Sequence, residues 1–238
     1  GGPAIMVGPG DAYHSQVPSW SSAGNHIVYH GGKREVRPVV VRSLADGSEK
    51  VLTDSLNHVG WYWGSWSPNS QLLTFMNTDF QNGIQVTELM MGDIGTGTIV
   101  TIDQVYPEPR SELRQMPVWF ANSERFLMIK GDSTNSEIVA VDIGDLTSQT
   151  LTTVQGIKCE AVLSPDEELI AFLVKSGNKM DIWLFDRVTE EEMQLTFSER
   201  EKAMLRFSPD GEKIAFVQNN TTTKNDIMVV SVDGGAPR

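Results

Sequence analysis

The sequence predicts an all-β fold, a β-propeller of four-stranded antiparallel blades, because one short phrase recurs five times along the chain. In each copy a bulky anchor residue is followed by a turn and a short apolar strand. The anchors are Trp20, Trp66, Trp119, Leu163 and Phe207, and the steps between them are 46, 53, 44 and 44 residues. A period of this length, built only from strand-like runs and turn residues, is typical of propeller blades.

The fifth copy shows why each phrase forms two strands. The apolar run from Leu205 to Phe207 leads into Ser208-Pro209-Asp210-Gly211. Proline presets φ for a turn, aspartate accepts a bond from the backbone two residues on, and glycine tolerates a positive φ, so the chain is expected to reverse here. The next run, Lys213 to Val217, is short and rich in β-forming residues.

Two further strands complete each period. A third run follows in the fifth copy, from Ile227 to Val232. The fourth strands of the earlier copies are expected at Lys50–Thr53, Thr98–Thr101, Gln149–Thr152 and Met193–Thr196. A sheet this small cannot bury both of its faces alone, so neighbouring blades are expected to stack face to face, with the anchors wedged between them.

This blade pattern, a tryptophan followed by Ser-Pro-Asp-Gly and a short hydrophobic strand, resembles the repeats of TolB-type propellers. The same repeats occur in the propeller domains of the tricorn protease and prolyl oligopeptidase groups. The resemblance covers nearly the whole chain, although the turns at Ser22-Ala23-Gly24 and at Phe120–Ser123 lack the proline. It implies a non-catalytic scaffold that binds a protein segment or a small ligand, in a periplasmic or extracellular setting.

The spacing at the N-terminus predicts how the ring closes. Val7 lies 13 residues before Trp20, as Thr53 lies 13 residues before Trp66. We therefore expect the N-terminal segment to supply the outer strand of the last blade, giving five blades in a single domain over residues 1–238, because an open propeller would expose two apolar sheet faces. A six-bladed or truncated propeller is the alternative, since TolB-type propellers usually have six blades.

Composition excludes several classes of function. The chain has 238 residues, of which 39% are hydrophobic and 21% charged, and its net charge is −12. An acidic protein repels phosphate, so nucleic acid is excluded as a partner, and no stretch is apolar and long enough for membrane insertion. The single cysteine, Cys159, excludes an internal disulfide framework and is expected to be small and buried. We expect a monomer, with Glu190–Glu192 on a solvated edge.

No local motif identifies catalytic chemistry. The sequence lacks G-x-S-x-G, H-E-x-x-H, cysteine and histidine zinc spacings, the P-loop and G-x-G-x-x-G. No catalytic residue and no cofactor is therefore assigned. Propeller active sites are assembled from single residues on different blades, so a channel-site carbohydrate-active enzyme of the lyase or glycosidase type stays open. An accessory propeller of a larger peptidase is a further alternative.

The candidate binding residues lie in the loops that enter the innermost strands, because these loops converge on the mouth of the central channel. The candidates, expected to be exposed, are Tyr13, His14, His58, Trp61, Tyr62, Arg110, Arg114, Lys158, Arg200 and Lys202. Aromatic rings beside arginine and lysine suit an anionic or carbohydrate ligand, or an inserted protein segment. Extra residues around Tyr106 to Arg114 are expected to serve recognition.

Two metal sites are weighed against simpler interpretations. His14 and His58 could hold a divalent metal with Asp11, but a third ligand with clear spacing is missing. The stretch from Asn77 to Gly83 is rich in oxygen ligands, but its spacing is one residue off a calcium loop, so a polar turn is expected. Three further residues are interpreted as structural: Trp63, His26 and His30.

Overall fold

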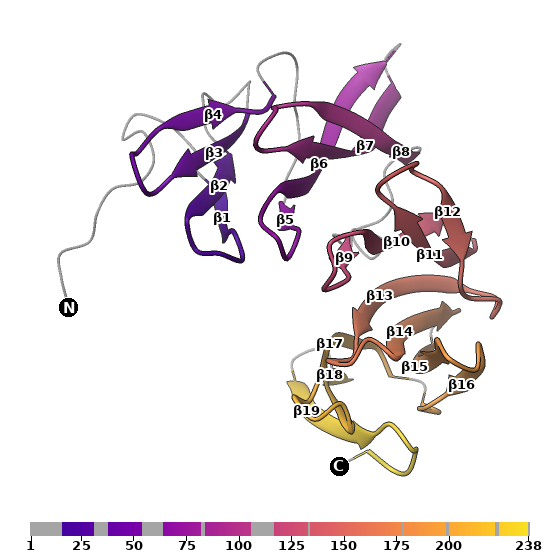
Figure 1. Ribbon diagram of the computed structural model, residues 1–238. Coiled ribbons are helices and arrows are strands. Elements are labelled where there is room, and N and C mark those ends of the chain that lie inside the picture. Colours follow the sequence, from indigo (N-terminus) through magenta and orange to yellow (C-terminus); the bar gives the residue numbers. More distant parts are fainter. Residues whose placement is uncertain are drawn as a thin grey trace. The chain divides into compact units, whose positions relative to one another are not determined.

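The computed structural model describes residues 16–30, 38–53, 64–81, 84–105, 117–132, 134–177, 179–198, 200–221 and 224–237. These residues form five antiparallel sheets (Figure 1). They include no helix, and so none that could cross a membrane. The expected all-β propeller fold is confirmed by this organisation. The chain separates into two compact units, residues 1–108 with 121–123 and residues 109–120 with 124–238; a single domain stays a prediction.

The first unit holds two four-stranded sheets, in which each strand pairs with the next along the chain. The first sheet consists of β1 (Gln16–Trp20), β2 (His26–His30), β3 (Val39–Ser43) and β4 (Glu49–Val51). The second sheet consists of β5 (Ser65–Trp66), β6 (Leu72–Gln81), β7 (Ile84–Asp93) and β8 (Ile99–Val105). Each anchor tryptophan is the last residue of the innermost strand of its sheet.

The second unit holds three sheets with the same strand order. The third sheet consists of β9 (Val118–Trp119), β10 (Arg125–Gly131), β11 (Ser136–Asp142) and β12 (Ser148–Thr150). The fourth consists of β13 (Ile157–Leu163), β14 (Leu169–Ser176), β15 (Lys179–Asp186) and β16 (Glu192–Gln194). The fifth consists of β17 (Lys202–Phe207), β18 (Lys213–Thr221) and β19 (Lys224–Ser231). The N-terminal strand predicted to close the ring lies outside the described residues.

The turn after each anchor has the same geometry in all five copies. The residue four positions after the anchor has a positive φ in each: Gly24 (70°), Ser70 (62°), Ser123 (62°), Glu167 (62°) and Gly211 (77°). In the fifth copy, the Ser208 hydroxyl accepts the Lys213 N–H at 2.9 Å and donates to the Asp210 carboxylate. The expected reversal is confirmed. In the fourth copy, where Glu167 replaces the glycine, Ser164 and Asp166 make the same bonds.

Two of the three anchor tryptophans are buried as expected. Trp66 and Trp119 are each 8% exposed, and the Trp66 indole N–H donates to the Ser19 carbonyl of the first sheet at 3.3 Å. Trp20 is 60% exposed, so the expectation that it is wedged between blades is wrong. Trp66 is buried against Val28 and Val41 of the first sheet, so the burial of an anchor depends on the sheet beside it and not on the residue alone.

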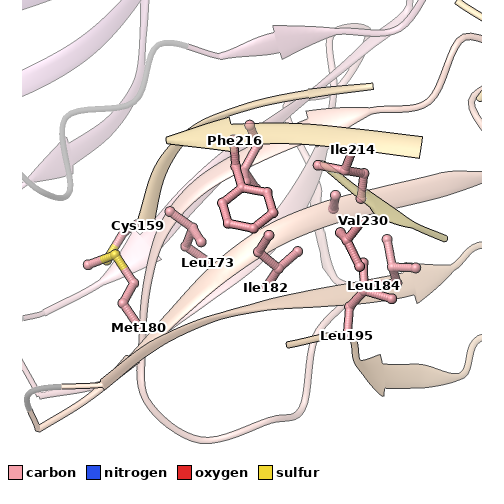
Figure 2. Packing of buried hydrophobic residues seen from close by; sticks show 11 residues of the cluster. Cys159, Leu173, Met180, Ile182, Leu184, Leu195, Ile214, Phe216 and Val230 are labelled. Carbon is pink, nitrogen blue, oxygen red and sulfur yellow. The ribbon is translucent and has the colours of Figure 1, made fainter. Parts of the chain in front are cut away.

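The fourth and fifth sheets share one hydrophobic cluster. The fourth sheet contributes Cys159, Ala171, Leu173, Met180, Ile182 and Leu184 together with Leu195, and the fifth contributes Leu205, Ile214, Phe216 and Val230. Figure 2 shows the Phe216 ring pointing toward Leu173 and Ile182. Phe216 is 1% exposed and Ile182 is fully buried, so this contact is core packing of the kind expected from stacked blades. Cys159, at 8% exposed, is buried as predicted.

The four predicted fourth strands are present, although three of them end at Val51, Thr150 and Gln194, just before the Leu-Thr pair that the prediction included. In three sheets a third-strand N–H donates to the threonine hydroxyl oxygen: Val39 to Thr53 at 2.9 Å, Ile138 to Thr152 at 3.0 Å and Ile182 to Thr196 at 2.9 Å. The carbonyls of the same three residues accept the N–H groups of Leu52, Leu151 and Leu195. The pair therefore satisfies both backbone groups of one residue where the regular ladder ends.

The second sheet departs from the others in its central hairpin. β6 pairs with β7 continuously from Leu72 opposite Asp93 to Gln81 opposite Ile84. The expected polar turn at Asn77–Gly83 is therefore wrong for residues 77–81, which are strand. Gly97 lies 31 residues after its anchor, whereas the corresponding residue lies 27 after the anchor in the first, third and fourth copies. Part of the extra length of this copy thus extends the hairpin, rather than lying only near Tyr106–Arg114.

Candidate ligand-binding loops of the fourth and fifth sheets

Three of the ten candidate binding residues lie in the described part of the chain, and all three belong to the second unit. Lys158 and Lys202 are 0% and 2% exposed, so the expectation that both are exposed is wrong. Arg200 is exposed, as expected. The other seven lie outside the described residues: Tyr13, His14, His58, Trp61, Tyr62, Arg110 and Arg114. Asp11 and Trp63 lie outside them too. A ligand-binding role for the ten stays a prediction.

The Lys202 ammonium is surrounded by oxygen atoms from the connection that precedes β17 and from β15. Its Nζ donates to the Ser198 hydroxyl at 2.8 Å, the Arg200 carbonyl at 3.3 Å and the Met180 carbonyl at 2.7 Å. It also forms an ion pair of 2.9 Å with Asp181, which is 7% exposed. Lys202 thus ties its own loop to β15 of the neighbouring sheet, and a buried charge of this kind is tolerated because its donors are satisfied.

Lys158 also fastens its own entry connection one repeat earlier, but without a direct ion pair. Its Nζ donates to the carbonyls of Val154 and Gly156, in the connection that enters β13. Burial lowers the pKa of the Lys158 ammonium below its ordinary value, and the charges of Glu192 and Glu137 only partly oppose this shift. The cation is therefore held chiefly by backbone carbonyl dipoles.

The shared place of the two lysines explains why their exposure was mispredicted. Each stands five residues before its anchor, where the long aliphatic stem lies along the sheet and the ammonium reaches back to the entering loop. A basic residue repeated at a fixed distance from the anchor was the sequence signal for this structural role, and Arg114 shares the same offset. Repetition across copies indicates architecture, whereas binding residues are expected to differ between copies.

Glu160 of β13 is a further charged group, and no sequence pattern singles it out. Its carboxylate accepts the N–H groups of Met204 at 2.7 Å and Leu205 at 2.9 Å, and the Arg206 guanidinium lies 3.5 Å away. These N–H groups belong to a β-bulge in β17, where Met204 has a φ of 61°. Burial raises the pKa of Glu160, while the two backbone bonds and Arg206 oppose the rise. Glu160 thus fixes the irregular backbone of the next innermost strand.

An exposed aromatic residue lies on the loop that Lys202 fastens. Phe197 is 77% exposed, between the buried Thr196 and Ser198, whose N–H donates to Asp181 at 3.0 Å. Exposed Arg200 lies three residues further on. Phe197 was missed because it directly follows the expected fourth strand Met193–Thr196. One sequence signal could have found it: the corresponding residue of the preceding copy is Thr153, which is polar, so the position is expected to face solvent.

The acidic run Glu190–Glu192 is not simply a solvated edge. The Glu192 carboxylate accepts the N–H groups of Thr153 and Val154, each at 3.1 Å from Oε2, and the Thr153 hydroxyl at 2.5 Å. These bonds hold the connection that Lys158 also fastens. Glu190 and Glu191 are exposed, so the expectation is right for them and wrong for Glu192.

Several other polar groups of the described chain are structural. Its residues include no group of three histidine, cysteine or acidic side chains that could hold a metal. His30 is 7% exposed, and His26 stacks on Trp66 with ring centroids 6.2 Å apart, in agreement with the structural roles expected for both histidines. In the second unit, Arg187 packs 4.5 Å from the Phe120 ring centre and donates to the Glu167 carbonyl. That arginine therefore contributes to packing between the third and fourth sheets.

The comparisons with known proteins support the propeller fold. No family model and no curated protein sequence matches the chain. Among solved structures, TolB from Acinetobacter baumannii is 19% identical with a TM-score of 0.60, over 92% of this chain and 50% of that one. An oligogalacturonate lyase in complex with manganese is 15% identical with a TM-score of 0.70, over 98% of this chain and 66% of that one. A puromycin-hydrolyzing peptidase from Mycobacterium tuberculosis is 16% identical with a TM-score of 0.68, over 94% and 37%.

These similarities agree with the repeats read in the sequence. The solved structures include TolB proteins and related propeller proteins, so the expected likeness to TolB-type propellers is confirmed at the level of the fold. The chain spans about half the length of the Acinetobacter baumannii protein and about a third of the peptidases. At identities below 20% the likeness shows architecture, and propellers of one architecture carry different functions. The chain therefore has the fold of a TolB-like β-propeller.

Proposed function

We propose that this chain is a non-catalytic binding propeller that captures a protein segment or a small ligand on the loops leading into its innermost strands. One observation carries the proposal: the loop from Thr196 to Lys202 exposes Phe197 and Arg200 while its backbone is bonded to Asp181 and Lys202. A loop already fixed in one conformation loses little entropy when a ligand binds.

The chemistry of the loop favours a partner with an acidic and an apolar group. Phe197 offers apolar contact area, and Arg200 offers a forked donor for a carboxylate. Aromatic and arginine side chains are the residues most often found to dominate binding energy at interfaces. In a chain with a net charge of −12, an exposed arginine three residues after an exposed phenylalanine is a distinctive local feature.

The likeness to TolB structures supports a periplasmic setting. A monomer that acts as a scaffold and binds proteins is part of this proposal. The acidic composition argues against nucleic acid as the partner. Under this proposal the buried lysines act as positioning residues, because each holds an entry loop without reaching solvent.

Similarity to an oligogalacturonate lyase in complex with manganese favours a second candidate, a channel-site enzyme acting on acidic carbohydrate. Its metal would be held by His14 and His58 with Asp11, which lie outside the described residues. The chain is also similar to peptidases, and it covers about a third of their length. This similarity supports another candidate function, an accessory propeller of a larger peptidase.

A thermal-shift panel separates the first two candidates, because a ligand that binds only the folded protein raises its melting temperature. The probes are MnCl2, oligogalacturonate, and a set of peptides that combine acidic with apolar residues. Binding by the loop predicts a shift with peptides, reduced about tenfold in affinity by Phe197→Ala or Arg200→Ala with the melting temperature of the free protein unchanged. The matched control is Arg125→Ala on the third sheet. A shift with MnCl2 and oligogalacturonate alone would reject the loop proposal and favour the enzyme.

A further inference from the structure

A small pocket lies between the third and fourth sheets, within the second unit. Its volume is about 160 Å³. A cavity of about 150 Å³ takes a ligand the size of benzene, so this pocket has room for about six non-hydrogen atoms. The buried rings of Phe120 and Phe185 line it from the two sheets. The charged and amide side chains that line it are those of Arg125, Gln149, Arg187 and Glu190.

The first two sheets show how the repeat fills the corresponding place with its own atoms. Lys50 Nζ of the first sheet donates to the carbonyls of Ile94 and Gly95 of the second, at 2.8 Å and 3.2 Å. Lys50 Cε lies 2.8 Å from the point where a Cβ on Gly97 would stand. The lysine therefore packs so closely against this turn that even a methyl group on Gly97 would collide with it.

Two residues of the pocket take the places of Lys50 and Gly97. Gln149 stands 30 residues after its anchor, as Lys50 does, but its side chain is shorter and uncharged. Glu190 and Gly97 hold the left-handed position of the turn after the third strand, with φ values of 60° and 80°. Where the first two sheets have an ammonium, the pocket thus has a neutral amide and a carboxylate.

Arg187 is the third replacement, and it breaks the pattern of the repeat. In every copy the residue at this position donates its N–H to the carbonyl of the fifth residue after the anchor. In the other four copies this residue is aliphatic: Leu44, Ile94, Ile143 and Val232. The architecture therefore does not require a guanidinium here, and residues that bind a ligand are expected to differ between copies.

The charges of Arg187 and Glu190 are not paired within the described part of the chain. The Arg187 guanidinium packs 4.5 Å from the Phe120 ring centre and donates to the Glu167 carbonyl, and neither contact supplies a negative charge. Glu190 is exposed on the same turn, and no ion pair joins it to Arg187 although both line the pocket. Arg125, by contrast, has the Asp142 carboxylate 3.8 Å from its Nε. The turn therefore offers the pocket an uncompensated cation and an uncompensated anion.

We propose that this pocket binds a small α-amino acid, whose carboxylate lies on the Arg187 guanidinium and whose ammonium lies beside Glu190, at the place that Lys50 gives its own ammonium in the first two sheets. A zwitterion satisfies both charges at once, and the planar fork of arginine suits a carboxylate. L-Alanine, with about six non-hydrogen atoms, matches the space.

The pocket is separate from the Phe197 loop, so this inference goes beyond the proposed function. That loop is bonded to Asp181, near the start of β15, at the end of the sheet where the innermost strands begin. Arg187 directly follows the last residue of β15, and Phe120 directly follows the last residue of β9. The two sites therefore lie at opposite ends of the strands.

The test is an NMR titration of the isotope-labelled full chain with L-alanine. We expect saturable shifts of the Gln149 side-chain amide and of the backbone N–H groups of Arg187 and Glu190. Propionate lacks the ammonium and ethylamine lacks the carboxylate, so each should bind at least about tenfold more weakly than L-alanine.

Three variants test the site with little risk to the fold, because each copies another repeat. Arg187→Leu restores the aliphatic residue and should abolish binding. Gln149→Lys copies Lys50 and should also abolish it, because the introduced ammonium enters the place of the ligand's. Glu190→Gly copies Gly97 and should weaken binding about tenfold. The matched control is Glu191→Gln at the exposed neighbouring position, which should bind normally.

Absence of saturable shifts, or shifts confined to residues outside the pocket, would overturn the proposal. Propionate binding as tightly as L-alanine would also overturn it, because the pocket would then be a simple anion site. Binding that Arg187→Leu and Gln149→Lys leave unchanged would place the ligand elsewhere, and since Gln149 is exposed, that variant keeps the test valid if Arg187→Leu does not fold. None of these outcomes depends on Phe197 or Arg200, so failure here is distinguishable from failure of the proposed function.

Discussion

The fourth and fifth sheets are the same repeat, 44 residues apart, and they solve the same problem with different electrostatics. Each places a lysine five residues before its anchor and buries it against the loop that enters the sheet. Lys202 is paired with Asp181 at 2.9 Å, whereas Lys158 donates to the carbonyls of Val154 and Gly156. The repeat therefore fixes the position of the cation, and the neighbouring sheet decides how its charge is compensated.

The same two sheets show that a sequence pattern fixes which face of a sheet is apolar, while burial depends on what lies against it. Ile182 and Ile227 occupy one position of the repeat, because each pairs with the residue ten positions after its anchor, and they differ from 0% to 80% in exposure. Stability should therefore depend on equivalent residues to very different degrees. The following substitutions test that difference.

The largest effect is expected at the carboxylate that compensates Lys202. Asp181→Ala leaves a buried ammonium without its counter-charge, and it also removes acceptors for Thr196 and Ser198, so unfolding free energy should fall by about 3–5 kcal/mol. Asp226→Ala, at the corresponding exposed position, should change it by less than about 0.5 kcal/mol. Urea unfolding measures both. Equal losses at the two positions would show that the ion pair does not stabilise this loop.

The second test compares the two isoleucines. Ile182→Ala should cost about 2–5 kcal/mol, because it opens a cavity beneath the Phe216 ring in the core of Figure 2. Ile227→Ala should cost less than about 0.5 kcal/mol, because its side chain is already in water. Both variants are compared by urea denaturation. A large loss at Ile227 would reveal that this face is covered in solution.

Much of the fold was readable from the sequence because blades are local. The anchors, the Ser208–Gly211 turn and the Leu-Thr strands each follow from short-range chemistry, and the structure confirms them. The exposed state of Trp20 could not be read in this way, because burial depends on a neighbouring sheet rather than on the residue. The strand content of residues 77–81 was missed because polar residues there pair through their backbones.

The candidate site was less predictable for a physical reason. Sequence reasoning took lysines near the channel mouth as exposed, since an isolated ammonium avoids burial. The carbonyls of Val154 and Gly156, and the carboxylate of Asp181, come from different segments, and no local pattern shows that they meet a lysine. The error for Phe197 was in the other direction: a hydrophobic residue after a strand is ordinarily assigned to the core, but this one is exposed.

A pH titration sharpens the comparison of the two lysines. Burial lowers the pKa of Lys158 in the folded protein below its ordinary value of 10.5, so the folded state releases this proton before the unfolded state does. Between the folded and the ordinary pKa the unfolded state binds more protons, and stability therefore rises with pH across that window. The unfolding free energy of the natural chain should accordingly gain on that of Lys158→Met as pH rises toward 10.5. A constant difference between the two would contradict the lowered pKa of the Lys158 ammonium.

The smallest effects concern the turn after each anchor, where Glu167 and Gly211 share one left-handed conformation with φ values of 62° and 77°. A Cβ added at Gly211 would lie 3.6 Å from Pro165 Cδ, which is ordinary contact, so Gly211→Ala should lose about 1 kcal/mol from backbone strain alone. Glu167→Gly relieves the same strain and should gain up to about 1 kcal/mol, reduced by the greater freedom of glycine in the unfolded chain. Thermal unfolding measures both signs. The two turns are bonded alike, through Ser164 with Asp166 and through Ser208 with Asp210. A loss of stability in Gly211→Ala together with a gain in Glu167→Gly would therefore show that backbone conformation sets the choice of residue. A loss in both variants would mean that the Glu167 side chain stabilises its turn.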